Sequence, residues 1–387
     1  MYYSHKKNGS LTKLSPPRHF VLVILVISNT LLVIPQTKNT RAAVSEQLSF
    51  SKPLVFKWQY ETREIIDLTP EIHGDFIFVP LSKGNLLSLR LQEGNLVWKS
   101  EIGGEVTASP SADGRSVYVA SREEQVEGST ASTASEGAVR ALGYLSGVTN
   151  WLSKLPRPIV GTLAANEHSV FGYSQEGHVY AIRKVDGQLL WVRKYDRAFT
   201  SAPLVNNDRL YLGSGDGTLY SLDVNTGAII WRYKTGGAIS SNVSVSGRTI
   251  CVGSADYHAY GLSLNDGRLL WRYRTGGRVQ SVASTPRGFL ITSLDNFVYL
   301  ISPLRGNRVW KRLLMGRVAA PPVTTLDGAL FAPLSGEECV VLELKSGRRL
   351  NSVYVGDGNN TSAAPLISGH ILLLTTRKGL YALTDRL

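Results

Sequence analysis

The side chains best suited to bind a metal ion or to act as nucleophiles are seven histidines and two cysteines. Cys251 and Cys339 lie 88 residues apart, so we expect two separate buried thiols rather than a disulfide or a metal site. No nucleophile motif surrounds either of them. No paired metal-ligand spacing occurs among the histidines, which stand at positions 5, 19, 73, 168, 178, 258 and 370.

The carboxylates and glycines offer no clearer catalytic candidate. Asp216, Asp256 and Asp266 stand in short stretches rich in glycine, asparagine and serine, which is typical of hairpin turns. A calcium site would need several oxygen ligands that converge on one point. The 37 glycines follow a long period rather than gathering in one phosphate-binding loop. We therefore expect neither a bound cofactor nor a metal ion.

That period is clearest in the tryptophans, which recur in steps of 40, 53, 40, 40, 40 and 39 residues. A glycine stands four positions before six of them. A seventh unit keeps this glycine as Gly347 but has Asn351 in the tryptophan position. The seven tryptophans are Trp58, Trp98, Trp151, Trp191, Trp231, Trp271 and Trp310.

Each unit reads as four short strands separated by turn residues. The NTG turn at Asn225 and the NDG turn at Asn265 predict tight hairpins, because asparagine and glycine both accept a positive φ angle. Four antiparallel strands per 40 residues make one propeller blade. The array begins with a lone fourth strand around Trp58 and ends after a third strand. We therefore predict an all-β, eight-bladed propeller whose N-terminal strand completes the C-terminal blade.

The repeat units also resemble those of a known family. Units such as LYSLDVNTGAIIWRY and AYGLSLNDGRLLWRY are similar to the PQQ-like β-propeller repeat, which quinoprotein dehydrogenases share with the BamB component of the outer-membrane β-barrel assembly machinery. The resemblance covers residues 54–387. In such repeats the tryptophan fills the gap between neighbouring blades, so the resemblance implies a structural role for all seven. It does not by itself assign a function, because one fold hosts unrelated activities.

An enzyme of this fold would need more than the repeat. Quinoprotein dehydrogenases are usually much longer, and their site resembles a calcium-bound quinone beneath a disulfide of adjacent cysteines. The distance between Cys251 and Cys339 along the chain excludes that disulfide. We therefore expect a noncatalytic protein.

The charge of the chain gives a further indication of function. The formal net charge is +12, and several of the basic residues follow the tryptophan of a repeat unit. Residues one and three places after a tryptophan should point away from its face of the strand, towards the rim of the predicted blades three to six, which contain Trp191, Trp231, Trp271 and Trp310. One interpretation is edge protection against strand addition. The other is attraction to anionic membrane headgroups or to an acidic partner. The rim candidates are Arg232, Lys234, Arg272, Arg274 and Lys311, together with Arg193, which stands two places after Trp191.

The first 45 residues differ from the rest. Basic residues precede an apolar run over 20–34, and Ala42 and Ala43 follow it. This order is typical of a secretory signal peptide, with an uncleaved membrane anchor as the alternative. We predict a signal peptide or anchor over 1–43, a linker over 44–53 and the propeller over 54–387. The polar segment 121–137 accounts for the single 53-residue step and is expected to be a mobile loop.

Three function classes remain open on the sequence alone. The first is an exported scaffold, similar to BamB, that binds envelope proteins such as β-barrel assembly components in the periplasm or at a membrane. It lacks the lipobox cysteine of that family, because no cysteine precedes Cys251. The others are a PQQ-dependent oxidoreductase and a membrane-anchored ligand-binding or sensory propeller. We expect a monomer that does not bind nucleic acid.

Overall fold

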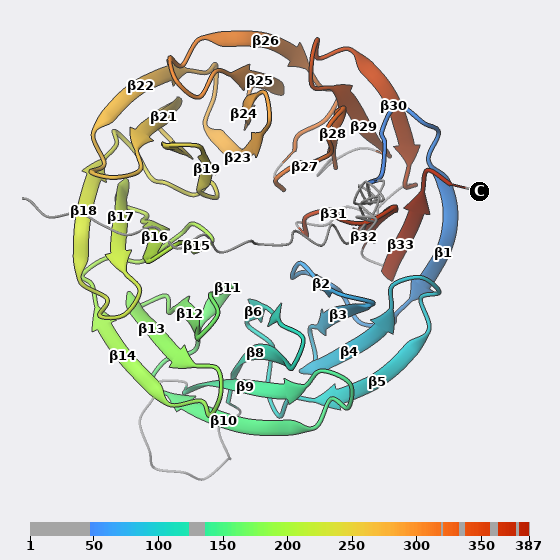
Figure 1. Cartoon of the computed structure of the whole chain (residues 1–387), viewed down its shortest axis with the longest axis vertical. Helices are drawn as coiled ribbons and strands as arrows, with labels where there is room; N and C mark the ends of the chain where they lie inside the picture. The colour runs from blue at the N-terminus through green and yellow to red at the C-terminus, as the bar shows by residue number, and fades with distance from the viewer. Residues whose placement is uncertain are drawn as a thin grey trace, which may run out of the picture. The chain divides into compact units, whose positions relative to one another are not determined.

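The computed structural model describes residues 47–123, 136–318, 320–332, 337–356, 363–376 and 379–386. Every regular element among them is a β-strand, and the strands form eight sheets arranged in a ring (Figure 1). None of these residues belongs to a helix long and apolar enough to cross a membrane. The apolar run over 20–34 and most of the inserted segment 121–137 lie outside the described residues. The predicted eight-bladed propeller is therefore confirmed.

Each blade runs from an inner strand near the centre of the ring to a rim strand at its edge. The strands of blades 1 and 2 are β2 (Glu71–His73), β3 (Phe76–Leu81), β4 (Asn85–Arg90), β5 (Leu96–Glu101), β7 (Ser111–Ala112), β8 (Ser116–Arg122), β9 (Gly137–Gly143) and β10 (Thr149–Leu155). Those of blades 3 and 4 are β11 (Val160–Ala165), β12 (Ser169–Tyr173), β13 (His178–Arg183), β14 (Leu189–Lys194), β15 (Leu204–Asn206), β16 (Arg209–Gly213), β17 (Thr218–Asp223) and β18 (Ile229–Lys234). A further strand, β6 (Ala108–Ser109), pairs parallel to β11 at the inner edge of blade 3.

The second half of the ring repeats this order. Blades 5 and 6 contain β19 (Ser244–Ser246), β20 (Thr249–Gly253), β21 (His258–Ser263), β22 (Leu269–Arg274), β23 (Val279–Thr285), β24 (Gly288–Ser293), β25 (Phe297–Ile301) and β26 (Arg308–Leu313). Blades 7 and 8 contain β27 (Val323–Thr324), β28 (Gly328–Phe331), β29 (Glu338–Glu343), β30 (Arg349–Tyr354), β31 (Leu366–Ser368), β32 (Ile371–Thr376), β33 (Gly379–Thr384) and β1 (Val55–Glu61). Antiparallel pairing of β1 with β33 closes the ring, as predicted.

The turns before the rim strands differ from the tight hairpins that were predicted. Five residues, 224–228, separate β17 from β18, and the register shifts where Leu222 faces Ile229. The positive φ angles belong to the glycines, 69° at Gly227 and 72° at Gly267, whereas Asn225 and Asn265 have none. A bulged hairpin turn with glycine at its left-handed position therefore joins the two strands.

The tryptophan and the glycine of the repeat meet across the junction between two blades. The ring of Trp58 in blade 8 lies over Gly94 in blade 1, and a Cβ atom at Gly94 would come within 2.6 Å of it. The indole of Trp58 donates a hydrogen bond of 3.0 Å to the carbonyl of Leu91. Six further junctions repeat this bond at 2.8–3.3 Å. Each glycine thus leaves room for the tryptophan of the preceding blade.

The junction between blades 7 and 8 lacks both partners. Asn351 replaces the tryptophan of blade 7, and Leu54 stands where blade 8 would have its glycine. Residues Leu48–Lys52, which we call the clasp and which lie within the predicted linker 44–53, fill the gap. Phe50 of the clasp is fully buried, and Leu48 is 2% exposed. The clasp thus supplies the apolar bulk that tryptophan supplies elsewhere.

Two turn residues hold the backbone of the clasp. The carboxylate of Asp327 accepts hydrogen bonds from the amides of Phe50 (3.2 Å) and Ser51 (2.8 Å) and from the hydroxyl of Ser49 (2.7 Å). The amide of Ser49 donates to Asp385 at 2.9 Å. Partial burial alone would raise the pKa of Asp327, but these bonds and one from a neighbouring threonine lower it to about 2.

Candidate functional site

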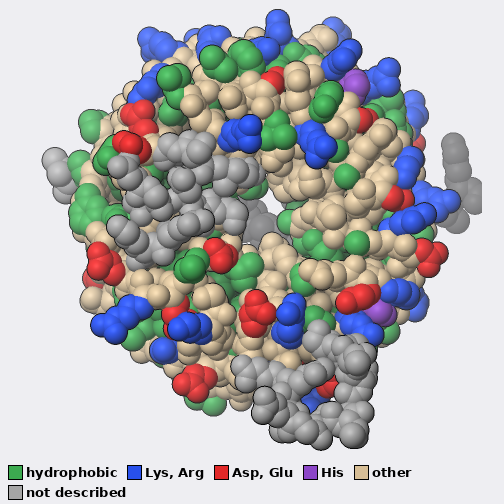
Figure 2. Space-filling view, turned by 180° about the vertical axis from the view of Figure 1, so that it is seen from behind, with side chains coloured by type: hydrophobic (Ala, Val, Ile, Leu, Met, Phe, Trp, Pro, Cys, Tyr) green, Lys and Arg blue, Asp and Glu red, His purple; other side chains and the backbone are tan. Residues whose placement is uncertain are grey.

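The predicted rim residues lie on the outer strands of the ring. Arg193, Arg232, Lys234, Arg272 and Arg274 are exposed, whereas Lys311 is half-buried with its Nζ atom 3.6 Å from the centre of the Phe297 ring. Figure 2 shows Lys and Arg side chains along the upper and right-hand edges of the ring. The rim strands β14, β18, β22, β26 and β30 carry ten Lys and Arg and no acid. By contrast, β1, β5 and β10 carry three Lys and two Glu.

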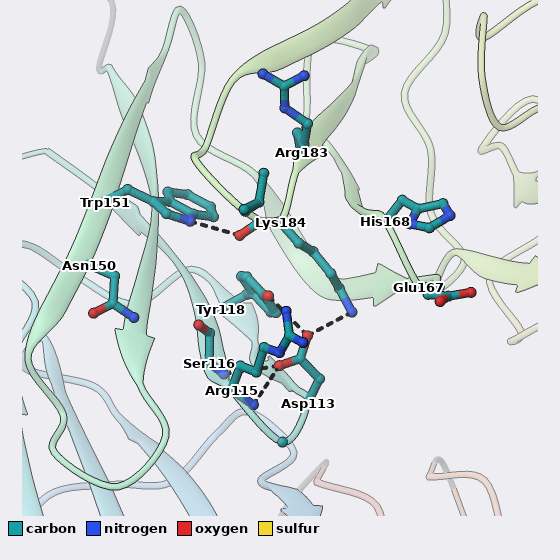
Figure 3. Close-up of a pocket in the computed structure, with 12 residues that line it drawn as sticks. Asp113, Arg115, Ser116, Tyr118, Asn150, Trp151, Glu167, His168, Arg183 and Lys184 are labelled. Carbon is teal, nitrogen blue, oxygen red and sulfur yellow. Dashed lines mark hydrogen bonds and ion pairs between the residues drawn. The ribbon is translucent and has the colours of Figure 1, made fainter.

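A hollow with convergent polar groups lies between blades 2 and 3 (Figure 3). We call it the blade 2–3 groove, and its volume is about 1020 Å³. Blade 2 contributes the turn before β8 and part of β10, and blade 3 contributes the turns that flank β12 and β13. The lining residues are Asp113, Gly114, Arg115, Ser116, Tyr118, Asn150, Trp151, Glu167, His168, Arg183, Lys184 and Val185.

An ion pair joins the two blades at the floor of this groove. The Nζ atom of Lys184 lies 3.1 Å from the Asp113 carboxylate and 5.3 Å from the centre of the Tyr118 ring. The hydroxyl of Tyr118 donates to the same carboxylate at 3.0 Å, and the amides of Arg115 and Ser116 donate to it at 2.9 Å. Every polar group of this cluster therefore has a partner.

The pKa shifts follow from these contacts. Partial burial alone would raise the pKa of Asp113, but the hydrogen bonds from Arg115, Ser116, Lys184 and Tyr118 outweigh it and lower that pKa. Burial, together with the negative charge of Asp113, raises the pKa of Tyr118 well above its usual range. Tyr118 therefore stays protonated at neutral pH and acts as a hydrogen-bond donor rather than as a base.

The side chain in the register position of Ser116 differs between junctions. In blade 4, Arg209 stands in the register position of Ser116 and fills the blade 4–5 junction, where it donates two hydrogen bonds of 2.7 Å. At the blade 1–2 junction, the space is filled by Tyr144 and Phe76, whose ring centres are 5.1 Å apart. Ser116 is too short to do the same, and Lys184 turns inward to reach Asp113.

The walls of the groove carry both charges. In Figure 3, Trp151 and Asn150 lie on one side, with Glu167 and His168 on the other. Arg183 points away from the floor and pairs with Asp186 just outside the groove, through two hydrogen bonds of 2.9 and 2.6 Å. Such a surface offers donors and acceptors to a polypeptide, because peptide groups need both.

Neither Asp113 nor Lys184 was predicted as a site residue. One signal was available, because the residue seven places before the tryptophan accepts the indole hydrogen bond of the preceding blade. Lys184 is the only charged side chain at that position, where the other units have Leu91, Tyr144, Val224, Leu264, Pro303 and Leu344. The pairing with Asp113, 71 residues earlier, has no sequence signal.

The residues do not fit the quinone site of the dehydrogenases that share this repeat. The adjacent-cysteine disulfide of those sites has no counterpart, because Cys251 and Cys339 are free, buried thiols in β20 and β29. Burial raises the pKa of the Cys339 thiol to about 12 and that of Cys251 further. Within the described ranges, no three His, Cys, Asp or Glu residues lie close enough together to hold a metal ion.

Fold and repeat together define a PQQ-like β-propeller. Residues 135–287 and 217–386 match the family model described as outer membrane protein assembly factor BamB, and these matches together span well over half of the chain. The chain therefore belongs to the BamB family, which confirms the resemblance seen in the repeats. No match is found among curated protein sequences.

Solved structures show the same fold at low sequence identity. BamB from Moraxella catarrhalis superposes with a TM-score of 0.70 at 16% identity over 86% of this chain and 97% of that one. The computationally designed Ika8 protein gives 0.70 at 14% identity, over 84% and 98%. Quinohemoprotein alcohol dehydrogenase from Comamonas testosteroni gives 0.69 at 12% identity, over 88% and 78%. The likeness extends to a designed protein and an enzyme, so it shows the fold alone.

Proposed function

We propose that this protein is a noncatalytic interaction scaffold of the cell envelope, which holds a partner protein in the blade 2–3 groove. The observation that carries the proposal is that this junction keeps the repeated Trp151 but has a charged residue, Lys184, at a position where the other units have uncharged side chains. Asp113 and Lys184 form a cross-blade pair at its floor, and open polar walls surround them. Family membership supports an envelope role, because the family description names an outer membrane protein assembly factor.

Protein binding suits the chemistry of the groove better than catalysis does. The groove presents Trp151, a large and only half-buried ring that can pack against an apolar side chain of a partner. Arg115, Glu167 and His168 are exposed at its margins and can pair with a partner of mixed charge. The Tyr118 hydroxyl and the Lys184 ammonium are both committed to Asp113, so neither is placed to attack a substrate.

Export is the second part of the proposal. Residues 1–43 have the composition of a signal peptide or an N-terminal anchor, which would deliver the propeller to the periplasm or a membrane surface. The partners would then be envelope proteins, with β-barrel assembly components as the family expectation. The basic rim would add attraction to anionic membranes or acidic partners, and this attraction would weaken as salt rises.

Site-specific crosslinking in the native envelope tests the groove. A photo-reactive residue at Asn150, in the groove wall, should give discrete adducts that mass spectrometry identifies as envelope proteins. Val97 of blade 1, which is 38% exposed and also directly precedes a tryptophan, is the matched control position. Equal adducts at both positions, or none at Asn150, would refute the groove as the partner site.

The noncatalytic part has its own test. The purified propeller, offered pyrroloquinoline quinone with calcium, should neither bind the quinone nor reduce an artificial electron acceptor in the presence of alcohols or sugars. Cofactor chemistry requires a single site that binds and orients the quinone, and the paired cysteines of such sites are missing here. Stoichiometric quinone binding with turnover would overturn the scaffold proposal.

A further inference from the structure

Pairs of tyrosines close the outer wedge of two successive junctions. At the blade 4–5 junction the ring centres of Tyr233 and Tyr260 are 5.9 Å apart, and at the blade 5–6 junction those of Tyr273 and Tyr299 are 5.5 Å apart. The hydroxyls of Tyr260 and Tyr299 each donate to an aspartate in their own blade. Aromatic rings thus fill this wedge where the repeat is regular.

The blade 6–7 junction has lost this pair. By strand register, Arg312 stands where Tyr233 and Tyr273 stand, and Val340 takes the place of Tyr260 and Tyr299. Arg312 lies along the wall, where it donates hydrogen bonds of 3.1 and 2.8 Å to the carbonyls of Gly347 and Ser346. The wedge is left as a hollow of about 550 Å³, which we call the blade 6–7 hollow.

The hollow combines an apolar floor with a cationic margin. Val340 and Leu342 line its floor, and Arg312, Arg348 and Arg349 surround it. Only Arg349 has an acidic partner among the described residues, Glu338 at 2.5 Å. At the lip of the hollow, the apolar side chain of Met315 is 94% exposed to solvent.

A second hollow of about 600 Å³ continues this surface along the rim. It shares Arg312 with the first, and it adds Arg308 and Lys345. No Asp or Glu lines either hollow within the part of the chain that the structure describes. The surroundings therefore favour an anionic occupant.

We propose that the blade 6–7 hollow binds an acidic peptide segment that carries an aromatic residue. The aromatic ring enters the wedge and packs on Val340 and Leu342, where tyrosines stand at the two preceding junctions. A carboxylate beside it pairs with Arg348 at the margin. A membrane surface fits less well, because a flat bilayer cannot enter a recessed wedge. This site goes beyond the scaffold function proposed above, and it lies in a different junction from the blade 2–3 groove.

Binding of a synthetic peptide tests the proposal. The probe is acetyl-Gly-Asp-Tyr-Glu-Gly-amide, measured by isothermal titration or by chemical-shift changes on the full exported propeller. Two control peptides replace its tyrosine by alanine or both acids by lysine. We expect the probe to bind at least about tenfold more tightly than either control.

Substitutions in the protein test whether the peptide binds in the blade 6–7 hollow. Arg348→Glu, an exposed change that should not affect folding, should weaken binding at least about tenfold, because it reverses the charge at the margin. Val340→Tyr should do the same by filling the wedge. Arg232→Glu, on the rim of blade 4, is the control and should leave binding unchanged.

Three outcomes would overturn the proposal. They are equal binding of the alanine peptide, unchanged binding by Arg348→Glu, and absence of peptide binding where vesicles of phosphatidylglycerol bind. None of these outcomes depends on the partner that occupies the blade 2–3 groove.

Discussion

The blade 7–8 and blade 2–3 junctions depart from the repeat in opposite ways. At the first, tryptophan and glycine are both missing, and the clasp fills the gap with Phe50 at full burial. At the second, Trp151 and Gly187 remain, yet a groove stays open above the Asp113–Lys184 pair. An irregularity that the chain fills itself serves closure of the ring. One that it leaves open, with its polar floor already satisfied, is available to a partner.

The largest effect on stability should come from removing the buried ring of the clasp. Phe50→Ala should lower the free energy of unfolding by about 3–4 kcal/mol, because it leaves a cavity where no tryptophan can substitute. Phe56→Ala, at a ring that is 60% exposed, is the matched control and should cost less than about 0.5 kcal/mol. Chemical denaturation of both variants measures the difference. Equal losses would remove the distinction between the clasp and the neighbouring chain.

The second largest effect on stability is expected at Asp327, whose carboxylate accepts hydrogen bonds from the clasp. Asp327→Ala should cost about 2 kcal/mol at neutral pH, because the buried amide of Phe50 loses its acceptor. Asp208, in the corresponding turn of blade 4, is exposed and serves as the control position.

The same residue predicts a pH dependence. The pKa of Asp327 is about 2 in the folded chain against an ordinary value of 3.8. Its contribution to stability is therefore fully present above pH 3.8 and is lost as the pH falls through about 2. The stability gap between wild type and Asp327→Ala should close over that range in thermal unfolding curves. A gap independent of pH would contradict the role of the carboxylate.

A smaller effect is expected at the floor of the open groove. Lys184→Met keeps the aliphatic stem over Tyr118 but leaves Asp113 without its cation, which should cost about 1 kcal/mol at neutral pH. The cost should shrink below pH 3.8, where an ordinary aspartate becomes protonated. Val185→Met, at an adjacent side chain that is 77% exposed, should be neutral. A loss as large as that of Phe50→Ala would make this junction structural as well.

The smallest effect is expected where the blade 2 segment is shortened. Glu123 pairs with Arg140 at 3.0 Å and its amide donates to the carbonyl of Glu136, so the two ends of the insertion are already adjacent. Replacing residues 124–135 by Asn-Gly should therefore change the free energy of unfolding by less than about 0.5 kcal/mol. A larger loss in denaturation would show that the segment packs on the ring.

Much of the fold could be predicted because it repeats. The spacing of the tryptophans, the lone first strand and the missing last strand indicated eight blades and the closure by β1. The clasp was missed although its signal was present, since Asn351 and Leu54 depart from the pattern at the same junction. The turn at Asn225 was predicted too tight, because a bulge in the register cannot be read from composition.

The sequence by itself determined the architecture of this protein, because a repeated strand pattern has to bury the same faces in every blade and can do so only in a closed ring. It also indicated which strands carry the basic side chains, because the tryptophan of each repeat marks the rim strand. Only the tertiary structure decided which junctions are filled and which are open. Each junction brings together residues from two blades, such as Asp113 and Lys184, and their fit depends on the shapes of both partners rather than on either stretch of sequence.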